Sequence, residues 1–182
     1  MPYRYEIRLS GEGGQGLVLA GLILAEAAAI YDGKNATQTQ AYGPESRGGA
    51  SKSEVIISDE EIDYPKATRV DMLLALTQEA CNKYWPDLKD SGVLIADSSR
   101  VLDLPKGDFQ VYHLPIIETA KEKVGKAVVA NIVSLGAINA ISKVVSQGAL
   151  EKAVLARVPK GTEELNRRAL EAGLELAHSP LK

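Results

Sequence analysis

The feature of this sequence with the clearest chemical potential is a glycine-rich run near the N-terminus. Its glycines have the spacing G-x-G-x-x-G, between Tyr5–Ser10, whose alternation predicts a strand, and the apolar stretch Leu17–Tyr31, which predicts a helix. Bare backbone N–H groups at the start of a helix can hold an anion. We therefore expect contact with a phosphate or with coenzyme A from Gly11, Gly13, Gly14, Gln15 and Gly16. An equal alternative is that the glycines only let the helix pack close to the sheet.

Two common nucleotide sites do not fit this run. A dinucleotide site also needs an acid about 20 residues further on, which binds the ribose hydroxyls. Residues 35–41 contain no acid, and Asp32 comes before Gly33 and the next predicted strand. A P-loop needs Lys and then Ser or Thr after its last glycine, where this chain has Leu17 and Val18. NAD binding is therefore the weaker interpretation, and nucleotide hydrolysis is disfavoured.

A second glycine-rich loop, at residues 42–49, combines a proline-fixed turn with one acid and one base. Glu45 and Arg47 could form a local ion pair, which contributes little to stability on an exposed loop. We favour an interface role, because a loop rich in glycine loses much backbone entropy when it is ordered and needs a partner to offset that loss. The residues expected to form an interface or to close an active site are Tyr42, Gly43, Pro44, Glu45, Arg47, Gly48 and Gly49.

Side chains that commonly act as catalysts or metal ligands are scarce. The chain has two histidines, His113 and His178, and one cysteine, Cys81. A lone cysteine in a predicted helix is more often a small packed side chain than a nucleophile, and one thiolate cannot hold an iron–sulfur cluster. We expect no catalytic residue and no metal site in this chain. Asn131, within an apolar helical segment, is expected to satisfy a nearby backbone group.

The composition describes a chain that can bury a sizeable core. Its 182 residues are 45% hydrophobic but only 5% aromatic, a balance that fits aliphatic helices packed on a parallel sheet. Lys and Arg number 21 against 24 Asp and Glu, so the net charge is −3 and there is no basic footprint for nucleic acid or anionic lipid. The apolar stretch at residues 17–31 is short for a membrane span and follows a glycine turn. We expect a cytoplasmic protein.

Strand and helix patterns follow one another along the chain. Further strands are predicted at residues 34–40, 53–58, 71–76, 93–96 and 109–113, helices at 78–85 and after Pro115, and a turn at 89–92. Residues 127–177 look helical, with breaks near Gly148 and at 159–161. We predict a single α/β domain over residues 1–182. It should be a Rossmann-like, three-layer α/β/α sandwich with a mostly parallel sheet, a ligand edge at the carboxyl ends of the strands, and the helix at 17–31 in its core.

Together, the two glycine-rich loops resemble those of the gamma subunits of the 2-oxoacid:ferredoxin oxidoreductases. The resemblance rests on Gly-Glu-Gly-Gly-Gln-Gly at residues 11–16 combined with residues 42–51, a pairing far more specific than either half. It continues through residues 71–76 and 130–137, and it covers roughly residues 7–177. Ser46 departs from the apolar residue that the family often carries at this position.

The resemblance implies a complex that converts a 2-oxoacid, coenzyme A and oxidised ferredoxin into acyl-CoA, carbon dioxide and reduced ferredoxin. It implies that thiamine diphosphate, Mg and iron–sulfur clusters belong to companion alpha, beta and ferredoxin-like subunits. The expected substrate is 2-oxoglutarate, while pyruvate, a branched-chain 2-oxoacid and an arylpyruvate stay open. A homodimer is considered for the isolated chain. The alternative function is a free-standing module that binds a nucleotide or coenzyme A.

Overall fold

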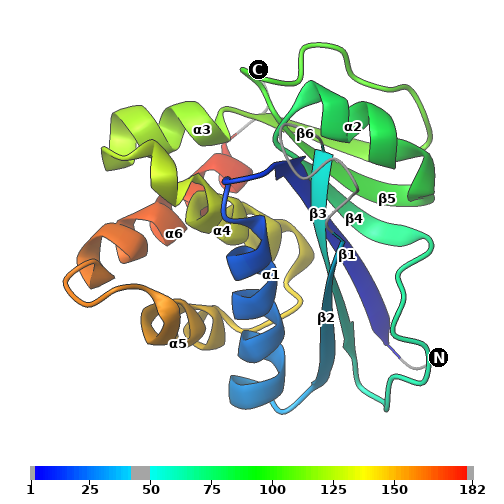
Figure 1. The fold of residues 1–182 in the computed structure, drawn as a ribbon, viewed down its shortest axis with the longest axis horizontal. Helices are drawn as coiled ribbons and strands as arrows, with labels where there is room; N and C mark the ends of the chain where they lie inside the picture. The colour runs from blue at the N-terminus through cyan, green and yellow to red at the C-terminus, as the bar shows by residue number, and fades with distance from the viewer. Residues whose placement is uncertain (1–2, 42–49, 180–182) are drawn as a thin grey trace.

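The structure, a computed structural model, describes residues 3–41 and 50–179. The second glycine-rich loop, from Tyr42 to Gly49, lies outside the described residues, so the interface expected there is not placed by the structure. The described segments form a mixed sheet with helices on both of its faces (Figure 1).

A six-stranded sheet forms the middle of the described structure, in the order β2-β3-β1-β4-β5-β6. Its strands are β1 (Arg4–Glu12), β2 (Asn35–Ala41), β3 (Ala50–Ser58), β4 (Val70–Ala75), β5 (Leu88–Asp97) and β6 (Gln110–Leu114). β1, β4, β5 and β6 are parallel, whereas β3 runs antiparallel to both β1 and β2. Each predicted strand is therefore present, and within this sheet β3 alone runs against the others.

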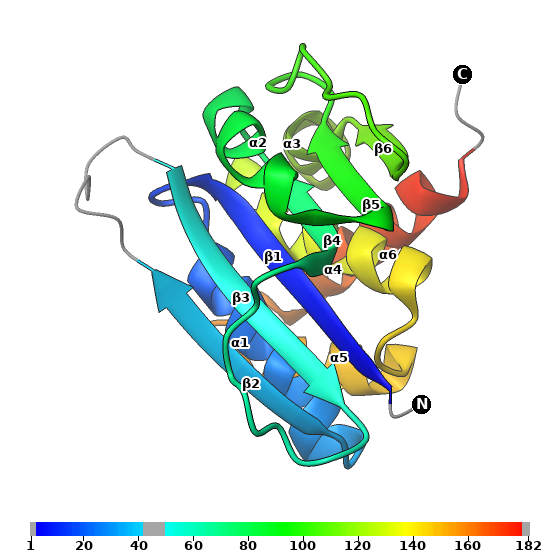
Figure 2. The same ribbon diagram turned by 90° about the vertical axis from the view of Figure 1, so that its right-hand side faces the viewer.

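Two helical layers of unequal size cover the sheet (Figures 1 and 2). The helices are α1 (Leu17–Glu26), α2 (Gln78–Tyr84), α3 (Ile116–Glu118), α4 (Ala130–Ser142), α5 (Gln147–Arg157) and α6 (Glu163–His178). α1 and α3 continue as π-helical segments, Ala27–Tyr31 and Thr119–Val124. α1, α4, α5 and α6 enclose the larger apolar core on one face, and α2 covers a smaller core on the other. The three-layer α/β/α arrangement is confirmed.

The alternation of side chains along β1 contributes to both layers. Ile7 is fully buried in the larger core, beneath the helices. Arg8 is also buried, but its guanidinium lies 2.6 Å from Asp87 Oδ2, 3.5 Å from Glu54 Oε1 and 5.3 Å from the centre of the Tyr84 ring. The two carboxylates and the aromatic face offset the desolvation of a charge that would otherwise be strongly unfavourable in this position.

Two glycines allow α4 and α6 to approach closely. A Cβ at Gly136 would lie 2.3 Å from the carbonyl oxygen of Leu170, and a Cβ at Gly173 would lie 2.0 Å from that of Val133. Neither distance is compatible with a side chain, and both obstacles are backbone atoms that cannot rotate away. The packing of the C-terminal helices therefore depends on both glycines.

Two local details differ from the sequence prediction. The turn expected at residues 89–92 is part of β5, where Ser91 adopts a left-handed φ of 64° and the pairing with β4 is irregular. The break expected near Gly148 lies at residues 143–146, so that Gly148 is inside α5. In both places the sequence pattern correctly indicated that regular secondary structure is interrupted nearby, but it did not predict the form or the exact position of the interruption.

Candidate functional site

The first glycine-rich run lies where β1 ends and α1 begins, at the edge of the sheet to which the carboxyl ends of the parallel strands point (Figure 1). Gly14 and Gly16 adopt φ angles of 89° and 73°, which residues with a side chain rarely adopt. Gly16 is the N-cap of α1, and no side chain caps this helix. The strand, the loop and the helix start are thus arranged as the glycine spacing predicts.

Gln15 closes the loop from within. Its Oε1 accepts a hydrogen bond from the Glu12 N–H at 2.8 Å. A Cβ at Gly11 would lie 2.1 Å from the same oxygen, so the missing side chain at Gly11 makes room for Gln15. The structure therefore gives each of these two residues a partner inside the loop.

Gly16 is in contact with the start of α4. The side-chain Nδ2 of Asn131, a buried residue, donates a hydrogen bond to the Gly16 carbonyl oxygen at 3.1 Å. A Cβ at Gly16 would lie 2.5 Å from that Nδ2 atom. The expectation that Asn131 satisfies a backbone group is confirmed, and the group belongs to the glycine loop.

Gly13 and Gly14 form the open part of the loop. No heavy atom lies within 4 Å of a Cβ built on either glycine. Their N–H groups donate no hydrogen bond to any of the residues that the structure describes. These amides and the uncapped start of α1 leave backbone donors available at a positive helix end, where an anion is favoured. Of the five residues predicted to contact a ligand, these two have room for one.

An ion pair lies at the end of β1 beside the glycine run, and an exposed apolar side chain precedes α4. Arg100 Nη2 lies 3.2 Å from Glu12 Oε1 at the end of β1. Asp97, at the end of β5, accepts the Arg100 N–H at 3.0 Å and so fixes the position of that residue. Val128, three residues before Asn131, is 75% exposed. Sequence reasoning missed Arg100 and Val128, although a residue that follows a predicted strand of a parallel sheet can be assigned to this edge.

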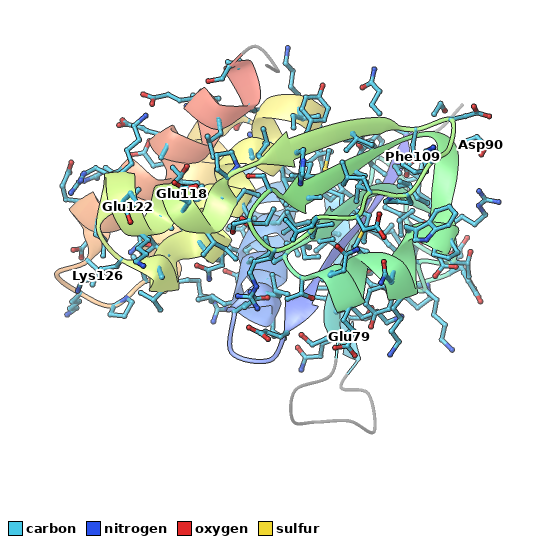
Figure 3. All side chains as sticks on the ribbon, turned by 90° about the horizontal axis from the view of Figure 1, so that it is seen from above. Glu79, Asp90, Phe109, Glu118, Glu122 and Lys126 are labelled. Atoms are coloured by element: carbon cyan, nitrogen blue, oxygen red, sulfur yellow. The ribbon has the colours of Figure 1, made fainter. Side chains whose placement is uncertain are left out.

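The charges around this edge are of mixed sign. Glu12 and Asp97 accompany Arg100 at the strand ends. In Figure 3, Glu79 of α2 lies on one side of the described structure, and Glu118, the last residue of α3, lies on the other with Glu122 and Lys126. These named residues include more acids than bases. An anionic group would be held mainly by backbone N–H groups.

The described side chains of catalytic type have structural partners. His113 Nε2 lies 2.7 Å from the Val101 carbonyl oxygen. Cys81 is fully buried, and burial raises the pKa of its thiol to about 11, so the thiol stays protonated near neutral pH. No group of three or more His, Cys, Asp or Glu side chains that could hold a metal ion occurs within residues 3–41 and 50–179. The described helices include none that is long and apolar enough to cross a bilayer.

The second glycine-rich loop begins and ends at this same edge. Ala41 is the last residue of β2, Ala50 is the first residue of β3, and Ala50 pairs with Glu12. The chain on both sides of residues 42–49 therefore meets the sheet next to the first glycine loop. The two segments singled out in the sequence are neighbours at their ends.

The identity of the strand beside β1 weighs against a dinucleotide site. In such a site the strand that follows the first helix lies parallel to β1 and ends with the ribose-binding acid. Here the antiparallel β3 occupies that position, and β2 lies one strand further away. The strand order and the absence of an acid in residues 35–41 therefore both argue against a dinucleotide site.

Comparison with known proteins places this chain in one family of oxidoreductases. Residues 6–176 match the pyruvate ferredoxin/flavodoxin oxidoreductase family. The chain is 52% identical to the 2-oxoglutarate synthase subunit KorC of Methanocaldococcus jannaschii, over 96% of this chain and 94% of that protein. It also matches the crystal structure of a keto/oxoacid ferredoxin oxidoreductase gamma subunit from Geobacter sulfurreducens. That match has a TM-score of 0.90 and 61% identity, and covers 96% of this chain and 97% of the other.

Two more distant relatives, both from Methanothermobacter thermautotrophicus, differ in substrate. The pyruvate synthase subunit PorC is 31% identical over 93% of this chain and 94% of its own length. The ketoisovalerate oxidoreductase subunit VorA is 33% identical over 97% of this chain, but the match covers only 37% of VorA. In VorA, the segment equivalent to this chain is thus one part of a longer polypeptide.

Proposed function

The chain belongs to the pyruvate ferredoxin/flavodoxin oxidoreductase family as a gamma subunit of the 2-oxoacid:ferredoxin oxidoreductases, and we propose that its complex oxidises 2-oxoglutarate. The observation that carries this proposal is the gradient of identity among relatives of similar length. Identity is 52% to a 2-oxoglutarate synthase subunit and 31% to a pyruvate synthase subunit. The alternative of a free-standing nucleotide-binding module is set aside, because these relatives are named as subunits.

We propose that this chain contributes no catalytic group of its own. Thiamine diphosphate, which stabilises the carbanion left when the 2-oxoacid loses carbon dioxide, and its Mg ion would be held by the alpha and beta subunits. Iron–sulfur clusters need several thiolates, and the chain has a single cysteine. Electrons would therefore pass to ferredoxin through clusters of companion subunits, including a ferredoxin-like one, in the cytoplasm.

The role proposed for the glycine loop is to bind coenzyme A, or another anionic group, at the edge of the active site. The support is geometric: Gly13 and Gly14 leave room on their outer side, and their N–H groups have no described acceptor. Glycine lets a ligand reach the backbone itself, and N–H groups at a helix start favour a phosphate. Gly11, Gln15 and Gly16 would act indirectly, because they hold the loop in shape.

The second glycine-rich loop is proposed to meet a companion subunit, with Arg47 as its main polar contact. A guanidinium suits a carboxylate or a phosphate because it can donate two parallel hydrogen bonds. The length of VorA supports contact with a companion, since that relative carries an equivalent of this chain and further sequence in one polypeptide. A chain whose equivalent can be joined covalently to another segment is suited to close contact with a separate subunit.

The test of the substrate is an assay of the assembled complex. The chain is co-produced with its companion subunits, and ferredoxin or viologen reduction is followed with coenzyme A and each 2-oxoacid in turn. The largest kcat/KM is expected with 2-oxoglutarate, and the isolated chain is expected to show no turnover. A larger kcat/KM with pyruvate or a branched-chain acid would overturn the substrate, and turnover by the isolated chain would overturn the non-catalytic role.

A further inference from the structure

β2 is an outer strand of the sheet without the features that usually protect such an edge (Figure 2). It pairs with β3 in uninterrupted register over its seven residues, and among the described residues no strand lies on its other side. Charged side chains, proline, bulges or short length normally prevent an edge from pairing with another chain. The sequence of β2, Asn-Ala-Thr-Gln-Thr-Gln-Ala, has neither charge nor proline. Its outer row of backbone N–H and C=O groups is therefore suited to pairing.

The helix beside β2 has an apolar outer side. α1 and its π-helical continuation pack on β2 and β3, and α4 and α5 lie against other parts of α1. Ile30 and Tyr31 are 65% and 40% exposed. The charge of Glu26 is neutralised by Arg157 of α5. The apolar residues of this segment that keep partial or large exposure are Val18, Leu19, Leu22, Ala29, Ile30 and Tyr31. A helix that is apolar on nearly every side is normally covered.

We propose that β2 and the outer side of α1 bind a second copy of this chain. The two β2 strands would lie antiparallel across a two-fold axis perpendicular to the sheet, so that two six-stranded sheets become continuous. With this axis the two α1 helices lie on the same side of the joined sheet and flank the new strand pair. This surface does not include the open residues Gly13 and Gly14 of the glycine loop, and the proposal does not depend on the identity of the substrate.

The side chains of β2 favour a second copy as the occupant. Across a two-fold axis a strand meets its own residues, so a charged residue near the axis would face its own charge, which is destabilising. β2 contains only Ala, Asn, Gln and Thr. Every antiparallel pairing of this strand with itself is therefore free of like-charge contacts. A strand selected for a charged partner would carry complementary charge.

The size of the interface requires both elements. Stable protein interfaces bury about 1,200–2,000 Å² in total, more than two seven-residue strands contribute by their edges. Exposed Ile30 and Tyr31 adjoin the start of β2 and add apolar area beside the strand pair. Both the edge and the helix side should therefore affect dimerisation when they are changed.

The oligomeric state of the full chain in solution tests this proposal. Sedimentation velocity across a range of concentrations is expected to show a dimer. Thr39→Lys, which places a charge on the exposed part of β2, and Ile30→Lys should each raise the dimer Kd about tenfold or more. Leu102→Lys is the matched control, because Leu102 is 79% exposed but lies in the connection between β5 and β6. It should leave the Kd unchanged, and thermal unfolding shows that each variant is folded.

Disulfide trapping can show which residues of the two β2 strands lie opposite each other in the dimer. The native Cys81 is fully buried, so a cysteine introduced in β2 is the reactive one. Opposed residues of antiparallel strands have Cβ atoms about 4.5–5.5 Å apart, near the range for a disulfide. A cysteine opposes its own copy only at the two-fold axis, so single cysteines are introduced in turn across residues 36–40, and the one at the axis should link two copies on oxidation. Lys160→Cys, in the exposed connection before α6, should not.

Three results would overturn the proposal. The first is a monomer at every concentration. The second is a dimer that Thr39→Lys and Ile30→Lys leave intact, because it would use another surface. The third is hydrogen-exchange protection of residues 35–41 that appears only when companion subunits are added, because the edge would then be covered by a different protein.

Discussion

The Asn131 side chain donates a hydrogen bond to the Gly16 carbonyl oxygen at 3.1 Å, and its Oδ1 accepts the Ile132 N–H at 2.9 Å. One side chain therefore holds the glycine loop and the start of α4 together, across 115 residues of sequence. We expect Asn131→Ala to lower the free energy of unfolding by about 1–2 kcal/mol, because the half-buried Gly16 carbonyl and the buried Ile132 N–H lose their partner. Urea unfolding measures this. Asn82→Ala is the control, because the Asn82 side chain accepts an exposed hydrogen bond from Gln78. This change should alter the free energy of unfolding by less than about 0.5 kcal/mol.

Gly13 and Gly16 should respond differently to the same change. Gly16→Ala is expected to destabilise the chain by about 2 kcal/mol or more, because it forces a side chain into a left-handed φ and against Asn131. Gly13→Ala meets no atom and should leave unfolding unchanged. If a ligand approaches this backbone, Gly13→Ala should raise the KM for coenzyme A in the assembled complex about tenfold. An unchanged KM and kcat in that variant would show that the open space at Gly13 is not used.

Gly173→Ala should be among the most damaging single changes in the C-terminal helices. The new methyl group would lie 2.0 Å from the Val133 carbonyl oxygen, so α6 must move away from α4. We expect a loss of about 3 kcal/mol or more in the free energy of unfolding. Gly148→Ala is the control, since nothing lies within 4 Å of its Cβ, and it should be neutral or stabilising by about 0.5 kcal/mol. Equal effects of the two changes on the melting temperature would contradict the packing described for α4 and α6.

Cys81 should resist alkylation in the folded chain and react once the chain is unfolded. Burial raises the pKa of its thiol from 9.0 to about 11. The unfolded state therefore loses the proton first as pH rises, and the stability that depends on the neutral thiol is present below pH 9 and is lost between about pH 9 and 11. Cys81→Ala should remove this component, so its stability should fall less steeply over that range. Rapid labelling of the native thiol by iodoacetamide at pH 8 would show that Cys81 is accessible.

Strand positions could be predicted from the sequence because short apolar or alternating runs between turn residues are local signals. The direction of β3 is not a property of its own residues. It could have been inferred from residues 42–49, because so short a connection can join antiparallel neighbours, whereas a parallel crossover needs a dozen or more residues. The expected turn at residues 89–92 lies within β5 as an irregular stretch. β5 pairs with β4 at Leu88 and again from Val93, opposite Val70 and Met72, so the residues between form a bulge that depends on the register of the two strands.

The glycine spacing predicted the location of the candidate site, but it did not predict which glycine packs against another side chain and which one is open. Gly11, Gly13 and Gly16 look alike in the sequence, whereas the structure places Gln15 against the first, solvent beside the second and Asn131 against the third. Asn131 is too distant in sequence for local reasoning to assign it to one glycine. Arg100 was missed because its pairing with Glu12 depends on the order of the strands.

The position of β3 between β1 and β2 also sets an order of events during synthesis. A nascent chain that ends at Ala41 contains two strands that are not neighbours in the final sheet, so neither can serve as the template for the other. β3 must emerge before this half of the sheet can form, and it then pairs with β1 over nine residues and with β2 over seven. Until then α1, which packs mainly on β3, has no complete surface to cover. The N-terminal third of the chain therefore leaves the ribosome with its most apolar helix exposed, and the packing of this helix on the sheet waits for residue 58.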